Sequence, residues 1–292
     1  MHALIQGVIL GVLTGGVYAL MASGQTLIFG IMKVVNLAQG AMVILGAYLA
    51  YQLFTSFGID PFLAIPITTV AMFAIGVAVQ LLFLRPLRRD EKSELSLLVT
   101  FAVALLLEGI MSLTWKTNYR SINTSYANSS WTVFGYQVTE VRLWAFVLSL
   151  VALGLLFLLL NRTRFGRAVR ATVQNPDSAR LLGVESERVA ALGFGLGAAT
   201  AAAAGSVYGL LYPFYSGSHY DLISRLLSIV VLGGLGSVGG AVVAAVIVST
   251  SSAVVASTIS PAWSEMTFFV ILLLVLLIRP QGLFGTVGRG AL

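Results

Sequence analysis

The sequence predicts an all-α, polytopic integral membrane protein with about eight or nine transmembrane helices. Of its 292 residues, 58% are hydrophobic and only 10% are charged, whereas soluble domains carry about 25% charged residues. The mean hydropathy is +0.95. Several uncharged runs approach or exceed the ~20 residues that span a bilayer; they include residues 62–84, 143–160, 189–215 and 226–264. We expect a single transmembrane domain over residues 1–292.

The first part of the chain, residues 1–59, carries one formal charge, that of Lys33. Its apolar start lacks the basic region of a signal peptide, so we expect it to remain as the first span. Lys33 is followed by VVNLAQGA, in which Asn36, Gln39 and Gly40 interrupt the apolar run. Irregular backbone at membrane depth is tolerated where protein or a water-filled cavity covers it. These three residues are therefore candidates for a broken or re-entrant helix on a transport path, and the alternative is close helix packing.

Two clusters of basic residues set the expected orientation, because Lys and Arg mark cytoplasmic loops. The first cluster comprises Arg85, Arg88, Arg89 and Lys92. The second, in the loop at 162–188, comprises Arg162, Arg164, Arg167, Arg170, Arg180 and Arg188. Two predicted spans, 95–115 and 142–160, separate the clusters, so both clusters can face the cytoplasm. The polar loop at 116–141 then faces outward, and the C-terminus, with Arg279 and the tail 288–292, is cytoplasmic.

Glu108 is the one ionisable residue in the predicted span at 95–115. An ionisable side chain inside a span is costly and is a candidate functional residue. Glu108 either holds helices together through hydrogen bonds or contacts substrate on a path, and the sequence leaves both open. Further along, Asp221 and Arg225 are four residues apart and can pair on one helix face. His219 is expected at the membrane interface.

The segment GGLGSVGG, at 233–240, places five glycines among eight residues of an uncharged run. Glycine this dense destabilises a helix. We therefore expect a break at Gly233, Gly234 and Gly236, beside the same transport path. The alternative is again that small residues allow two helices to pack closely.

The basic loop at 162–188 contains a short helix of its own. Asn175 is a good N-cap and Pro176 suits the first helical position. Asp177 favours the positive end of the helix dipole, and Gly183 is a typical residue just past a helix end. The helix would expose Leu181 or Leu182 beside Arg180. It either docks into a groove on a partner protein or lies on anionic lipid, which flanking arginines also favour.

Sequence signatures of catalysis and metal binding are missing. The chain has no cysteine, which excludes thiolate metal sites and a catalytic thiol. It has no phosphate-binding loop of the G-x-x-x-x-G-K-[ST] type and none of the common hydrolase motifs. The net charge of +6 arises largely from basic residues beside apolar spans. We therefore expect no catalytic residue, metal, cofactor or nucleic-acid partner for this chain.

The basic loop resembles the cytoplasmic coupling loop of ABC importer permeases, specifically the branched-chain amino-acid permeases of the LivH type. The shared pattern is R-x-G-R-A-x-R-A-x(3)-N-x(3)-A-x-L-x-G, which begins at Arg164 and ends at Gly183. Three further stretches are similar to family motifs in the same order: GVLTGGVYALMASGQTLIFGIMKVVNLAQGAMVILGAYLA, LGGLGSVGGAVVAAVI and RPQGLFG. The residues that the resemblance assigns to ATPase coupling are Arg167, Arg170, Ala171, Asn175, Pro176, Ala179, Arg180, Leu181, Leu182 and Gly183.

The resemblance implies a subunit of an ATP-driven importer in the plasma membrane, the inner membrane of a bacterium. Its partners would be two ATPase subunits that bind ATP and Mg²⁺, a second permease subunit, more often a paralogue than a copy, and an extracytoplasmic solute-binding protein. The substrate would be a branched-chain or other hydrophobic amino acid, although similar permeases carry urea, short amides or other amino acids. A different reading of the residues is an ion-coupled transporter that uses Glu108.

Overall fold

A computed structural model describes residues 2–87, 92–124, 126, 129–133 and 136–285. Arg88, Arg89 and the tail 288–292, which the orientation argument places in the cytoplasm, lie outside these residues. The helices are α1 (His2–Met32), α2 (Gln39–Phe57), α3 (Pro61–Val79), α4 (Lys92–Trp115), α5 (Glu140–Arg162), α6 (Arg164–Gln174), α7 (Pro176–Leu181), α8 (Ser186–Leu211), α9 (His219–Gly233), α10 (Val238–Thr258) and α11 (Pro261–Ile278). A π-helical turn, Gln80–Leu84, extends α3, and a 3₁₀ turn, Ser216–Ser218, precedes α9.

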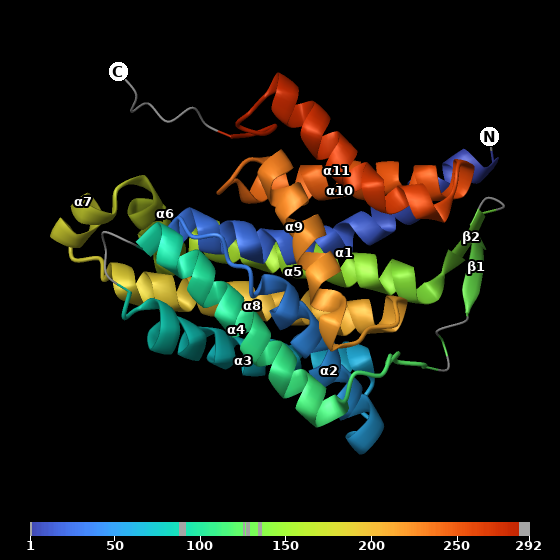
Figure 1. The fold of residues 1–292 in the computed structure, drawn as a ribbon, viewed down its shortest axis with the longest axis horizontal. Helices are drawn as coiled ribbons and strands as arrows, with labels where there is room; N and C mark the ends of the chain where they lie inside the picture. Colours follow the sequence, from blue (N-terminus) through green and yellow to red (C-terminus); the bar gives the residue numbers. More distant parts are fainter. Residues whose placement is uncertain (1, 88–91, 125, 127–128, 134–135, 286–292) are drawn as a thin grey trace.

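The predicted fold class is confirmed. Within the described residues, eight helices are long and apolar enough to cross a membrane. Helix α9 is not one of these eight, because it has only 15 residues. It would extend about 22 Å, which is less than the ~30 Å thickness of the hydrocarbon core. In Figure 1 α9 runs at a steep angle to α1, α8 and α10. The chain is therefore a polytopic bundle with one short helix laid across it.

The two ends of the bundle carry different structures (Figure 1). Helices α6 and α7 lie at one end, which we call the α7 end. At the opposite end, the hairpin end, strand β1 (Ser130–Val133) pairs antiparallel with β2 (Tyr136–Thr139). The His2 ring of α1 lies tilted against the Tyr136 ring, with their centroids 4.5 Å apart. Gln6 Nε2 donates to the Gln137 carbonyl at 2.6 Å. The all-helical prediction did not include this hairpin, which belongs to the loop predicted at 116–141.

Helices α1 and α10 pack side by side along a row of glycines on α1. A Cβ atom at Gly7 would lie 3.0 Å from Val254 Cα, and one at Gly15 would lie 3.0 Å from Val246 Cα. At Gly11 it would lie 2.9 Å from the Ser249 carbonyl oxygen. The backbones of the two helices are thus in direct contact, as small residues permit in membranes.

Replacing Gly11 by valine is expected to lower the stability of the fold. The added side chain would overlap the backbone of α10, and overpacking of this kind costs about 1–3 kcal/mol. Gly109→Val is the matched control, because nothing lies within 4 Å of a Cβ at Gly109 on α4. The measurement is the thermal unfolding midpoint of the purified protein in detergent. Equal midpoints for the two variants would contradict the packing described here.

Candidate functional site

Helix α7 is a short helix, capped at both ends, in the loop between α5 and α8. Asn175 Oδ1 accepts hydrogen bonds from the backbone N–H groups of Asp177, at 3.1 Å, and Ser178, at 3.0 Å. Pro176 occupies the first helical position. At the other end Gly183 has φ +82°, and the N–H of Val184 donates to the Ala179 carbonyl at 3.0 Å. Both helix ends predicted from sequence are confirmed.

The exposed surface of α7 includes two leucines as well as the charged Asp177. Leu181 and Leu182 are 90% and 83% exposed, whereas Ala179 on the opposite side is buried. Arg180 pairs with Asp177 at 3.4 Å, so its charge is partly balanced. Two neighbouring leucines are thus exposed on a structured loop, as a candidate interaction surface would require.

Helix α6, which carries Arg167, Arg170 and Ala171, fastens α7 to the membrane helices. Arg167 is exposed and available to a partner. Arg170 instead bonds within the chain: its Nη1 donates to the Leu160 carbonyl and to Asn161 Oδ1 at the end of α5. A cation at a helix C-terminus satisfies open carbonyl groups and the helix dipole. The resemblance assigns Arg170 to ATPase coupling and does not indicate this contact within the chain.

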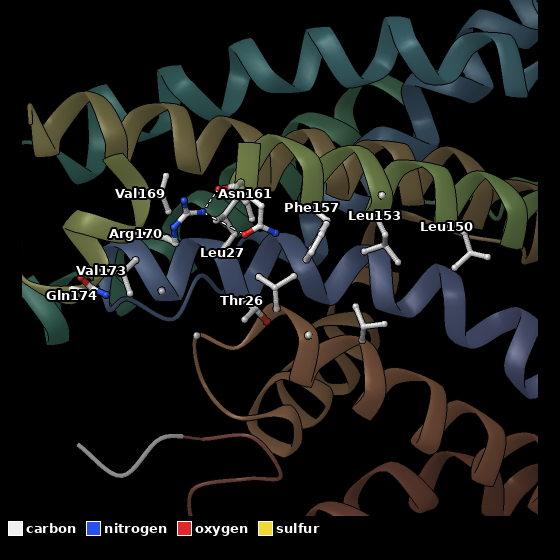
Figure 2. A pocket seen from close by; sticks show the side chains of 17 residues that line it. Thr26, Leu27, Leu150, Leu153, Phe157, Asn161, Val169, Arg170, Val173 and Gln174 are labelled. Atoms are coloured by element: carbon white, nitrogen blue, oxygen red, sulfur yellow. Dashed lines mark hydrogen bonds between the residues drawn. The ribbon is translucent and has the colours of Figure 1, made fainter. Parts of the chain in front are cut away.

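A pocket of about 730 Å³ opens beside α6 at the α7 end. Figure 2 shows Leu150, Leu153 and Phe157 of α5 lining it, with Asn161 and Arg170 toward its α6 side. Its remaining wall includes α1 and the turn between α9 and α10. Most of the lining is aliphatic or aromatic, as in pockets that accept small apolar molecules.

The glycine segment at 233–240 breaks the chain as predicted. Helix α9 ends at Gly233, α10 begins at Val238, and Gly234 and Gly236 have φ +96° and +88°. Gly236 lines the pocket at the α7 end. Gly233 and Gly234 are packed instead, and their region is held by the C-terminal motif: the N–H of Leu283 donates to the Leu232 carbonyl at 2.8 Å.

The second predicted interruption, at Asn36, Gln39 and Gly40, separates α1 from α2. Asn36 and Gln39 are both fully buried. Asn36 Oδ1 accepts from the Ala38 N–H at 3.1 Å, and Gln39 Nε2 donates to the Gly197 carbonyl of α8 at 3.1 Å. A Cβ at Gly40 would lie 2.6 Å from the His219 carbonyl oxygen. None of these three residues lines the pocket at the α7 end. The hydrogen bonds of Asn36 and Gln39 hold the break together.

Glu108 bridges α4 and α9. Its Oε2 accepts from the Tyr220 hydroxyl at 2.8 Å and lies 3.1 Å from His219 Nε2. His219, which the sequence leads us to expect at the membrane interface, is buried within the protein, with a side chain only 2% exposed. The backbone places it at the start of α9, facing the bundle, where the Glu108 carboxylate satisfies one of its nitrogens. Glu108 and Gly40 therefore both lie against the start of α9. Gly233, Gly234 and Gly236 lie at its other end.

The predicted Asp221–Arg225 pair is wrong. The Arg225 guanidinium pairs with Glu265 of α11 at 2.8 Å and donates to the Tyr18 hydroxyl of α1 at 3.0 Å. Asp221 is exposed on the first turn of α9. A partner 40 residues away has no signature in local spacing, so sequence reasoning could not find Glu265.

Comparison with known proteins agrees with this architecture. The family model described as branched-chain amino acid transport system / permease component matches residues 7–276. The high-affinity branched-chain amino acid transport system permease protein BraD of Pseudomonas aeruginosa is 27% identical over 294 residues, covering 96% of this chain and 95% of the relative. The corresponding LivH protein of Escherichia coli is 28% identical over 292 residues, covering 94% and 93%.

A third relative is similar over most of its length. The probable branched-chain amino acid transport permease protein LivH of Methanocaldococcus jannaschii is 27% identical over 279 residues, covering 91% of this chain and 88% of the relative. No solved structure is significantly similar to this chain. Because the family model spans nearly all the membrane helices described above, the chain belongs to the family of branched-chain amino acid transport permease components.

Proposed function

We propose that this chain is the membrane-spanning subunit of an ATP-driven importer and that α7 docks on a separate ATPase subunit. The observation that carries this proposal is the exposure of Leu181 and Leu182 on a helix capped at both ends. A rigid apolar tip outside the spans suits a groove on a partner. ATP and Mg²⁺ would be bound on that partner, with hydrolysis there driving alternating access here.

The proposed topology follows from the two ends of the bundle. The α7 end carries the basic loop and faces the cytoplasm, together with the C-terminus, and the hairpin end faces outward. Two ATPase subunits would serve two permease subunits, the second being a paralogue, and a solute-binding protein would deliver substrate at the hairpin end. The membrane would be the inner membrane of a bacterium.

The proposed substrate is a branched-chain or other hydrophobic amino acid. Supporting this, the relatives above are named for branched-chain amino acids, and the pocket at the α7 end is lined largely by apolar side chains. That pocket adjoins both Gly236, in the break before α10, and α6. We assign it to the cytoplasmic end of the path, where movement of α6 would change its shape. Asn36, Gln39, Gly40 and Glu108 would support the short helix α9 beside the path.

The test of the proposed function is co-purification with the ATPase subunits in detergent. The unaltered chain is expected to retain them, whereas a chain with both Leu181→Asp and Leu182→Asp is expected to lose them, because two charges would be buried in an apolar groove. The matched control changes Leu155 and Leu158 to serine, since these leucines are also exposed but lie on the membrane span α5. Solute uptake driven by a proton gradient without any ATPase would contradict the proposal and favour Glu108 as an ion site.

A further inference from the structure

A second pocket, of about 410 Å³, lies at the hairpin end. It is formed where the starts of α1, α5 and α11 meet the end of α10 and one turn of α9. Its volume falls within the roughly 300–1,000 Å³ of small-molecule sites. The residues that line it include Tyr18, Arg142, Arg225, Ser249, Glu265 and Phe268. None of these residues was singled out for the transport path on sequence grounds.

Arg225 forms one wall of this pocket and is held in place by three contacts. It donates to the Tyr18 hydroxyl at 3.0 Å, pairs with Glu265 Oε1 at 2.8 Å and lies over the Phe268 ring at 5.7 Å. Tyr18 and Phe268 pack edge to face at 5.8 Å. These contacts fix the Arg225 guanidinium beside the Tyr18 and Phe268 side chains. A fixed donor of this kind is preorganised for a carboxylate.

Two polar side chains that line the pocket have no partner among the described residues. Within the described part of the chain, the partly buried Arg142 guanidinium forms no ion pair or hydrogen bond. Ser249 is 4% exposed, and its Oγ is buried without a hydrogen-bond partner among those residues. Buried polar atoms are almost always satisfied, so each exception calls for an explanation. Ser249 Oγ has almost no accessible surface, so a ligand in the pocket would supply the missing partner of Arg142.

The charges in the pocket indicate what kind of ligand fits. Arg142 and Arg225 contribute two positive charges and Glu265 contributes one negative charge. A carboxylate can therefore bind between the arginines, while an ammonium group can share the exposed Glu265 carboxylate. Leu10, Ala253 and Ala256, which are only partly buried, offer an apolar surface for the rest of the molecule. A zwitterion with a hydrophobic side chain satisfies all of these groups at once.

We propose that this hairpin-end pocket is a binding site for the amino-acid substrate itself, in which Arg142 and Arg225 hold its α-carboxylate and Glu265 its α-ammonium group. The inference rests on the proposed import function, because it makes the pocket the first site that substrate occupies after delivery at the outer face. Selection for the backbone groups of an amino acid would then occur in the membrane subunit. Amides and carboxylic acids without an amine would be rejected at this site.

The absence of native cysteine gives a direct test. Ala256 lines the pocket, so Ala256→Cys places a thiol in it without removing a hydrogen bond. Thr258→Cys is the matched control, because Thr258 is an exposed residue two positions further along α10. Each variant is assembled with its ATPase and partner permease subunits in liposomes. A membrane-impermeant maleimide is added with leucine, leucinamide or 4-methylpentanoate, and labelling of this chain is followed over time.

The expected result is protection of Ala256→Cys by leucine alone, with labelling slowed about tenfold at ten times the dissociation constant because only the free site reacts. The Thr258→Cys rate should not change. Adding Arg142→Gln should raise the leucine concentration needed for half-protection about tenfold or more. Arg162→Gln, at the other end of α5, should leave it unchanged.

Three results would overturn the assignment while the ATPases still co-purify. The first is labelling that leucine does not slow. The second is equal protection by leucinamide. The third is labelling that depends on the phosphatidylethanolamine content of the liposomes and not on leucine, which would make the pocket a lipid headgroup site. Loss of the ATPases from the unaltered chain would instead contradict the proposed import function.

Discussion

Replacing Gly234 by valine is expected to prevent the turn between α9 and α10 from forming. Gly234 has φ +96°, a backbone conformation that β-branched residues avoid. A Cβ atom there would also lie 2.9 Å from Gly285 Cα, so the C-terminal motif would be displaced. The strain of about 1–2 kcal/mol and overpacking of about 1–3 kcal/mol act together. We expect most of the protein to be lost from the membrane fraction, and the remainder to unfold at a lower temperature.

The matched control for this prediction is Gly239→Val. Gly239 belongs to the same glycine segment, but it lies inside α10 and nothing lies within 4 Å of a Cβ atom there. Membrane yield and unfolding midpoint should stay close to those of the unaltered chain. If Gly234→Val behaves like Gly239→Val, the turn is not a fixed part of the fold.

Replacing Glu108 by leucine is expected to destabilise the contact between α4 and α9. The change removes the acceptor of the Tyr220 hydroxyl and the partner of His219 Nε2. Because His219 Nδ1 already lacks a partner among the described residues, the whole imidazole would be buried unsatisfied. An unsatisfied buried polar group costs about 1–3 kcal/mol. The unfolding midpoint should fall, and proteolysis near α9 should become faster.

Glu108→Gln separates this structural role from a charge-dependent one. Glutamine keeps an oxygen that accepts from Tyr220 and a polar group beside His219, so stability should be largely restored. If Glu108 acted instead as an ion site, Glu108→Gln would abolish transport while leaving the fold intact. Measuring uptake and unfolding for both variants distinguishes the two roles.

The parts of the fold that sequence predicts well are those set by neighbouring residues. The cap of α7 depends on Asn175 and Pro176, which act on backbone groups two or three residues away. The breaks after α1 and before α10 follow from polar residues or glycines inside apolar runs. Spans follow from length and hydropathy, which need no knowledge of neighbouring helices.

The parts that it misses depend on which helices become neighbours. Asp221 is the nearest opposite charge to Arg225 in sequence, but α9 turns Arg225 toward Glu265 of α11 and Tyr18 of α1. The burial of His219 beside Glu108 likewise depends on two helices that lie far apart in the sequence. The hairpin-end pocket combines five helices, so no local pattern could indicate it.

Helices α6 and α7 are attached to the membrane helices through α6. Arg170 ties α6 to the end of α5, and Val169 packs in one apolar cluster with Leu27 of α1 and Val189 of α8. Force applied at the α7 tip is therefore shared among three membrane helices at their common end. A displacement of α7 would act on these three helices through one shared attachment.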